Sequence, residues 1–64
     1  MIYIIGKPLL NRETYFKKDG TGFTTDITNA ASYHNENLAE HDLVRLSPVL
    51  FRQVVSIEFR NEES

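Results

Sequence analysis

The stretch from Thr21 to Tyr33 constrains the fold most, because strand-forming residues there give way to helix-forming ones. Directly before it, Asp19-Gly20 supplies the positive φ angles that a tight hairpin needs. Phe23-Thr24-Thr25 then favours a short strand, and Ala30-Ala31 favours a short helical turn whose small side chains can pack closely. The stretch therefore predicts the end of a small antiparallel sheet that is followed by helical structure.

Two further strands are predicted before this stretch. Residues 1–5 are β-branched and aromatic and apolar at every position, which is typical of a central strand with both faces covered. Pro8 has no N–H to donate to a ladder, so the strand stops there or becomes an edge. Leu9-Leu10 lies in the following loop, where we expect the leucines to fold back on the core, with an exposed apolar loop as the alternative. Residues 13–18 form the second strand, so that the first three strands make an antiparallel meander.

A helix and a last strand follow. Asn37 and Glu40 have the spacing of a helix-capping box, and Ser47-Pro48 is expected to end the helix. Residues 49–60 alternate between apolar and mostly polar positions, which predicts a long strand with one buried face. The expected core is made by Ile2 or Ile4, Phe16, Phe23, Tyr33, Leu38, Leu43, Leu46, Val55 and Ile57, with Phe51 and Phe59 on the same face of the last strand.

These elements predict one α+β domain over residues 1–64. The simplest architecture is a small antiparallel sheet of three to four strands in the order β-β-β-α-β, with one helix packed on one face. Residues 61–64 are expected to be a frayed tail. A chain of 64 residues buries too little surface for high stability, and it has no cysteine for a disulfide. Self-association is the remaining way to add stability, so a homodimer is one expected state.

Composition excludes several functional classes. The apolar start is too short for a signal peptide or a membrane span, so we expect a cytoplasmic protein with no membrane association. His34 and His41 are seven residues apart, which is not a recognised metal-ligand spacing on a helix. The serines lack the flanking glycines of a nucleophile elbow, and no glycine-rich phosphate loop is present. We therefore expect a non-enzymatic protein without a metal or cofactor.

Two binding functions remain. Tyr3, Tyr15, Lys17 and Lys18 could form a sheet face that stacks bases and holds phosphates. The net charge of −2 opposes this alternative, so we expect no nucleic-acid binding at physiological salt.

A protein partner fits the chain better. One candidate surface is an exposed strand edge, and Arg52 and Val54 lie on the last strand, which could supply it. The other is the acidic stretch formed by Glu36, Glu40 and Asp42, which could meet a basic patch. The same acidic residues would also be explained by the positive end of a helix dipole.

The middle of the chain also resembles a known group of proteins. The pattern of Tyr15-Phe16, Asp19-Gly20, the segment 23–27, Ala30, Tyr33 and Leu38-Ala39 resembles that of small orphan proteins encoded by bacteriophages and prophages. It covers about residues 13–43 and carries no catalytic residue. The resemblance implies an accessory protein that binds, and thereby inhibits or modulates, a host protein. A nucleic-acid-binding accessory protein and a self-associating structural protein are the alternatives.

Overall fold

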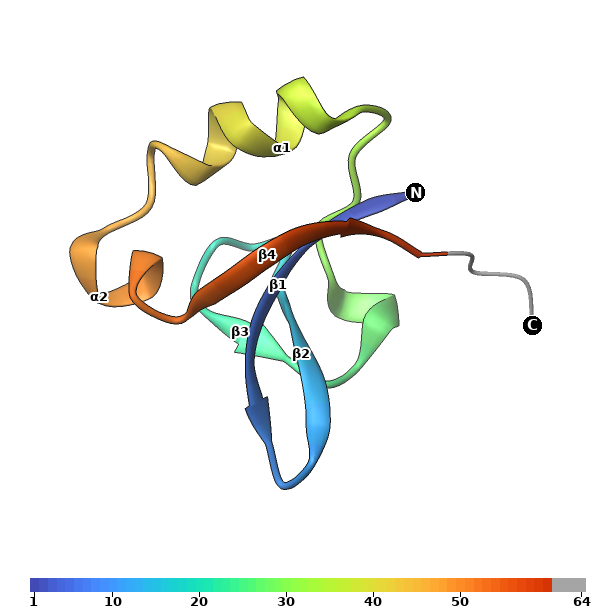
Figure 1. Ribbon diagram of the computed structural model, residues 1–64, viewed down its shortest axis with the longest axis vertical. Coiled ribbons are helices and arrows are strands. Elements are labelled where there is room, and N and C mark those ends of the chain that lie inside the picture. The colour runs from blue at the N-terminus through green and yellow to red at the C-terminus, as the bar shows by residue number, and fades with distance from the viewer. Residues whose placement is uncertain (61–64) are drawn as a thin grey trace.

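The computed structural model describes residues 1–60 as a four-stranded antiparallel sheet with helices joined to it (Figure 1). The strand order is β3-β2-β1-β4, and helix α1 packs against one face of the sheet. The predicted α+β class is therefore confirmed. Residues 61–64, for which a frayed tail is predicted, lie outside the described residues. Along the chain the elements are β1 (Ile2–Leu9), β2 (Arg12–Phe16), β3 (Phe23–Thr24), the 3-10 helix η1 (Ile27–Asn29), α1 (Glu36–Leu43), α2 (Pro48–Phe51) and β4 (Val54–Phe59).

Strand β1 is central and is covered on both faces over residues 2–5, as the apolar run predicts. It does not stop at Pro8, however, but continues to Leu9. Because successive side chains point to opposite faces, Ile4 joins one cluster while Tyr3 and Ile5 join another. The cluster on the α1 side is centred on Ile4, Phe16 and Ala39. It also takes in Ile2, Phe23, Ala31, Tyr33, Leu43, Leu46, Leu50, Val54 and Ile57.

The segment from Ala30 to Tyr33 connects the two faces. Its backbone pairs with Lys17 at one end and with Ile2 at the other, so it runs beside the ends of β2 and β1. Ala30 packs with Tyr3 and Ile5, whereas Ala31 and Tyr33 pack on the α1 side. Small side chains are needed here because the segment lies against the sheet itself.

The start of α1 corrects one prediction. The N-cap residue is Asn35, whose side-chain oxygen accepts a hydrogen bond of 3.0 Å from the Leu38 backbone N–H. Asn37, which the capping-box spacing favours, lies inside the first turn and is exposed. Leu38, predicted in the core, is 48% exposed, while its neighbour Ala39 is fully buried. The rest of the predicted apolar face, Ala39, Leu43 and Leu46, does pack in the core, so the prediction is wrong for Leu38.

The last strand is shorter than predicted. Helix α1 ends at Leu43, earlier than the predicted end at Ser47-Pro48. Ser47-Pro48 instead begins α2, with the Ser47 hydroxyl oxygen accepting from the Leu50 N–H. Proline suits the first position of a helix because its missing N–H would have no partner there. Strand β4 consequently begins only at Val54.

A β-bulge changes the faces of β4. Gly6 pairs with Val54 and Ile5 pairs with Ser56, so Val55 is an extra residue. Val54 therefore packs into the core together with Ile57, while Val55 is 59% exposed. Phe59 shares the side of Ile57 but is the last residue of β4, and it is 68% exposed. The prediction of a core face is right for Ile57 and wrong for Val55, Phe59 and Phe51, which is 52% exposed.

Candidate functional site

The turn between β1 and β2 has an unusual residue for its conformation. Leu9 pairs with Arg12, which leaves Leu10 and Asn11 as a two-residue turn. Both have positive φ angles, 53° and 65°, the pattern of a type I′ hairpin turn. Asparagine tolerates this left-handed conformation, but leucine does not favour it, at a cost of about 1–2 kcal/mol. A strained residue that the turn chemistry does not select is a candidate for a functional role.

The side chains of this turn are exposed. Leu10 is 88% exposed and Leu9 is 59% exposed, so the expectation that they fold back on the core is wrong. The hairpin extends away from α1, and its end lies at the opposite side of the molecule from that helix in Figure 1. We call residues 7–12 the hairpin tip.

The charge at the hairpin tip is positive. Lys7 and Arg12 are both exposed and flank the two leucines. Glu13, the nearest acidic residue in sequence, forms an ion pair with Arg60. An apolar pair between two cations therefore projects from a chain whose net charge is −2.

The base of the hairpin is held in place. The Thr14 hydroxyl donates a hydrogen bond of 2.8 Å to the Lys7 carbonyl oxygen, where the register of β1 and β2 shifts. Thr14 itself is buried. This hydrogen bond ties the start of the tip to β2, and such a restraint lowers the entropy lost when a partner binds.

The acidic residues proposed for a protein interface lie on α1 and differ in environment. Glu36 and Glu40 are exposed, but Asp42 is half-buried and accepts a hydrogen bond of 2.8 Å from the Tyr33 hydroxyl. Of the other two candidates, Arg52 is the C-cap residue of α2 and Val54 packs into the core. The structure distributes these five residues over three elements.

The residues proposed for nucleic-acid binding do not present two rings to solvent. Tyr3 is 1% exposed, and its ring centroid lies 5.7 Å from that of Tyr15. Lys17 is half-buried, and the Lys18 amine donates a hydrogen bond of 3.3 Å to the Thr28 carbonyl oxygen. A base cannot stack on Tyr3, so Tyr15 is the one ring of the two that solvent can reach.

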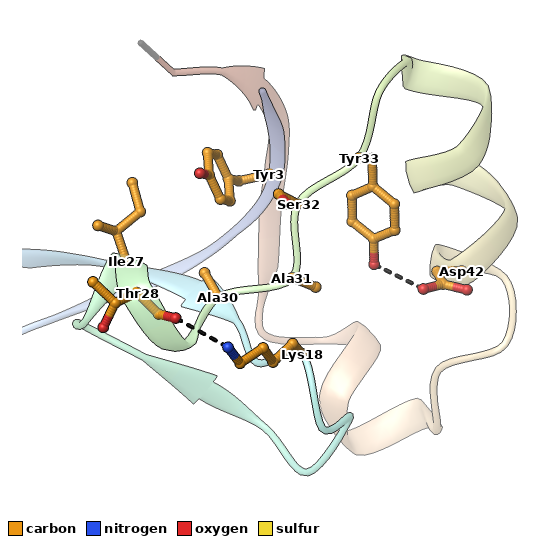
Figure 2. Close-up of a pocket in the computed structure, with 9 residues that line it drawn as sticks. All are labelled: Tyr3, Lys18, Ile27, Thr28, Ala30, Ala31, Ser32, Tyr33 and Asp42. Atoms are coloured by element: carbon orange, nitrogen blue, oxygen red, sulfur yellow. Dashed lines mark hydrogen bonds between the residues drawn. The ribbon is translucent and has the colours of Figure 1, made fainter. Parts of the chain in front are cut away.

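A hollow of about 500 Å³ lies beside these residues (Figure 2). Burial, and then the hydrogen bond to Asp42, raise the pKa of the Tyr33 phenol, so it stays protonated at neutral pH. The Lys18 amine points away from Tyr33, toward the Thr28 carbonyl oxygen. Two pairs of lining residues thus bond to each other, Tyr33 with Asp42 and Lys18 with Thr28. The hollow is lined by Tyr3, Lys18, Ile27, Thr28, Ala30, Ala31, Ser32, Tyr33 and Asp42.

Neither a cluster of metal-ligating side chains nor a membrane-spanning helix is found within residues 1–60. No group of three histidine or acidic side chains is arranged to hold a metal ion in this part of the chain. No helix there has the length and apolar character needed to cross a bilayer.

Leu9 and Leu10 are site residues that sequence reasoning misses. The available signal is Asn11, a turn-forming residue between two β-type segments, which would place Leu10 at a turn position. A scan against protein-family models, a search of curated proteins and a search of solved structures each found no match to this chain.

Proposed function

We propose that this chain is a non-enzymatic accessory protein that binds a protein partner through the hairpin tip. The observation that carries the proposal is Leu10, an 88% exposed leucine in a left-handed turn conformation. Neither packing within the chain nor turn propensity accounts for leucine at this position. Burial against a partner would account for it, because a fully buried leucine side chain contributes about 1.5–3 kcal/mol.

The chemistry of the tip defines the partner's surface. Leu9 and Leu10 require an apolar pocket, and Lys7 and Arg12 favour acidic groups at the rim of that pocket. The resemblance to small phage and prophage proteins supports a bacterial host protein as the partner, with inhibition or modulation of that protein as the result. The site of action would then be the host cytoplasm.

Capture from bacterial lysate tests the proposal. Lysate is treated with nuclease and passed over the immobilised wild type, Leu10→Ser and the control Val44→Ser, which removes an exposed apolar side chain far from the hairpin tip. Val44 is 78% exposed at the end of α1, so both variants should fold. We expect a protein that binds the wild type and Val44→Ser but not Leu10→Ser.

The other outcomes identify the alternatives. Recovery of nucleic acid alone, lost on nuclease treatment, would favour the nucleic-acid-binding hypothesis. Leu10-dependent binding to anionic lipid vesicles, without a captured protein, would mean that the tip contacts a membrane surface. Equal capture by all three forms would show that the partner uses another surface.

A further inference from the structure

The outer edge of β4 has backbone groups that no other strand within residues 1–60 pairs, although the Phe59 carbonyl oxygen accepts a long hydrogen bond of 3.5 Å from the Arg60 guanidinium. Within residues 1–60, β1 is the only strand that pairs with β4. Met1 and Arg60 exchange backbone hydrogen bonds in both directions, of 2.9 and 3.2 Å. Bonded and non-bonded pairs alternate in an antiparallel ladder, so Glu58 faces β1 while Ile57 and Phe59 direct their N–H and C=O groups outward. These groups are a template for another strand.

The charged residues near this edge bond mainly to one another, and Arg60 also donates a hydrogen bond of 3.5 Å to the Phe59 carbonyl oxygen. Arg60 forms ion pairs with Glu58 and with Glu13, and the Ser56 hydroxyl donates a hydrogen bond to Glu58. Charged side chains on an edge strand normally discourage pairing. Here they satisfy one another within the chain, so their capacity to repel a second strand is reduced.

The sequence of the edge is symmetric in character. Residues 55–59 read apolar, polar, apolar, polar, apolar, with Ile57 at the centre. We propose that a second copy of this chain occupies the edge, so that two β4 strands pair antiparallel with Ile57 on the two-fold axis. In this register Phe59 lies opposite Val55 of the partner copy, and Glu58 lies opposite its Ser56. A two-fold interface must be complementary to itself, and the alternating pattern of residues 55–59 meets this requirement because it reads the same in both directions.

Neighbouring registers are less favourable. Moving the axis to Glu58 places two carboxylates directly opposite each other, which destabilises a pair of strands. Moving it to Ser56 leaves Phe59 beyond the end of the partner's strand, opposite Gln53. Only the register centred on Ile57 pairs every residue from Val55 to Phe59.

The pairing would join two sheets into one of eight strands. The other sheet edge, β3, has two residues and is too short to support the same contact. Because the pairing is antiparallel, the two hairpin tips would lie toward opposite ends of the joined sheet. The dimer therefore leaves the proposed partner site accessible, and it does not depend on the proposed function.

Sedimentation equilibrium over a wide range of protein concentration tests the dimer. We expect a reversible change from a 7.4 kDa species to one of twice that mass. Val55→Lys and Phe59→Glu should each shift the equilibrium to monomer, while the control Leu10→Lys should not. Both edge residues are more than half exposed, so the variants should fold.

The double variant Val55→Lys/Phe59→Glu tests the register. It should recover the dimer, because the introduced lysine and glutamate come opposite each other across the two-fold axis. A 7.4 kDa wild type at every concentration would overturn the proposal, as would a dimer that neither single variant weakens.

Cysteine cross-linking gives an independent reading of the register, since the chain has no cysteine. Val55→Cys and Phe59→Cys proteins are mixed under mild oxidation. Directly opposed strand residues lie within the Cα distance that a disulfide requires. We expect the mixed disulfide to form in preference to either homodimeric one, and an excess of the homodimeric products would overturn the register.

Discussion

The ring of Phe23 occupies the space that a side chain at Gly6 would fill. A Cβ atom on Gly6 would lie 2.5 Å from Phe23 Cδ2 and 2.6 Å from Thr14 Oγ1. Phe23 in turn packs edge-on against Phe16, with their ring centroids 5.6 Å apart. The absence of a side chain at one β1 position thus allows an aromatic ring from β3 to reach across β2 and close the core.

Gly6→Ala should therefore destabilise the fold by about 1–3 kcal/mol, the usual cost of overpacking. Urea denaturation of the variant measures this change in the free energy of unfolding. In a Phe23→Ala background the same substitution should cost less, because the ring it meets has been removed. An equal cost in both backgrounds would show that Phe23 is not the obstacle.

The cap of α1 gives a second prediction. Asn35→Ala should lower the free energy of unfolding by about 1 kcal/mol, since it removes the side-chain acceptor for the Leu38 N–H. Asn37→Ala, an exposed substitution inside the helix, is the matched control and should change it by less than about 0.5 kcal/mol. Thermal unfolding followed by circular dichroism compares the two, and the reverse order would restore the cap predicted from the capping-box spacing.

The bulge in β4 gives a third prediction. Ile57→Ala should cost about 2 kcal/mol or more, because Ile57 packs against the cluster that contains Ile4 and Ala39. Val55→Ala should change the free energy of unfolding by about 0.5 kcal/mol or less, since Val55 is 59% exposed. Both values should be measured at a concentration where the protein is monomeric. Similar costs at the two positions would contradict the bulge.

The hydrogen bond between Tyr33 and Asp42 gives a pH-dependent prediction. The pKa of the Tyr33 phenol is raised above its ordinary value of 10.0, first by burial and then by Asp42. Above pH 10.0 the unfolded chain loses this proton while the folded chain keeps it, so stability should fall as the pH rises further. Tyr33→Phe should lose less stability over the same interval. Urea denaturation on both sides of pH 10.0 tests this, and parallel pH profiles for the two proteins would contradict it.

The parts of the fold that depend on local chemistry can be predicted from the sequence. Asp19-Gly20 identifies the second hairpin, and the apolar run of residues 1–5 identifies a strand with two covered faces. Period-two counting fails in β4 because one inserted residue, Val55, shifts every position before it. A bulge depends on the register with β1, which no local pattern in the strand reveals.

The candidate site is harder to predict for a related reason. Leucine pairs normally indicate burial, which predicts core positions for Leu9 and Leu10. Their exposure follows from the register of β1 with β2, which places Leu10 and Asn11 at the turn. The apolar run of residues 1–5 predicts that Tyr3 is covered, but no local pattern identifies Ala30 and Ile27 as the residues that pack on its face of the sheet.

The variant Leu10→Gly tests the role of the hairpin tip most directly, because partner binding and turn stability make opposite demands at this position. Glycine adopts a positive φ without strain, so the variant should be at least as stable as the wild type. It also removes the exposed side chain, so capture of the partner protein should be lost. Melting temperature and capture from nuclease-treated lysate are measured on the same preparations. We expect an equal or higher melting temperature together with loss of capture; undiminished capture by Leu10→Gly would contradict a binding role for the tip.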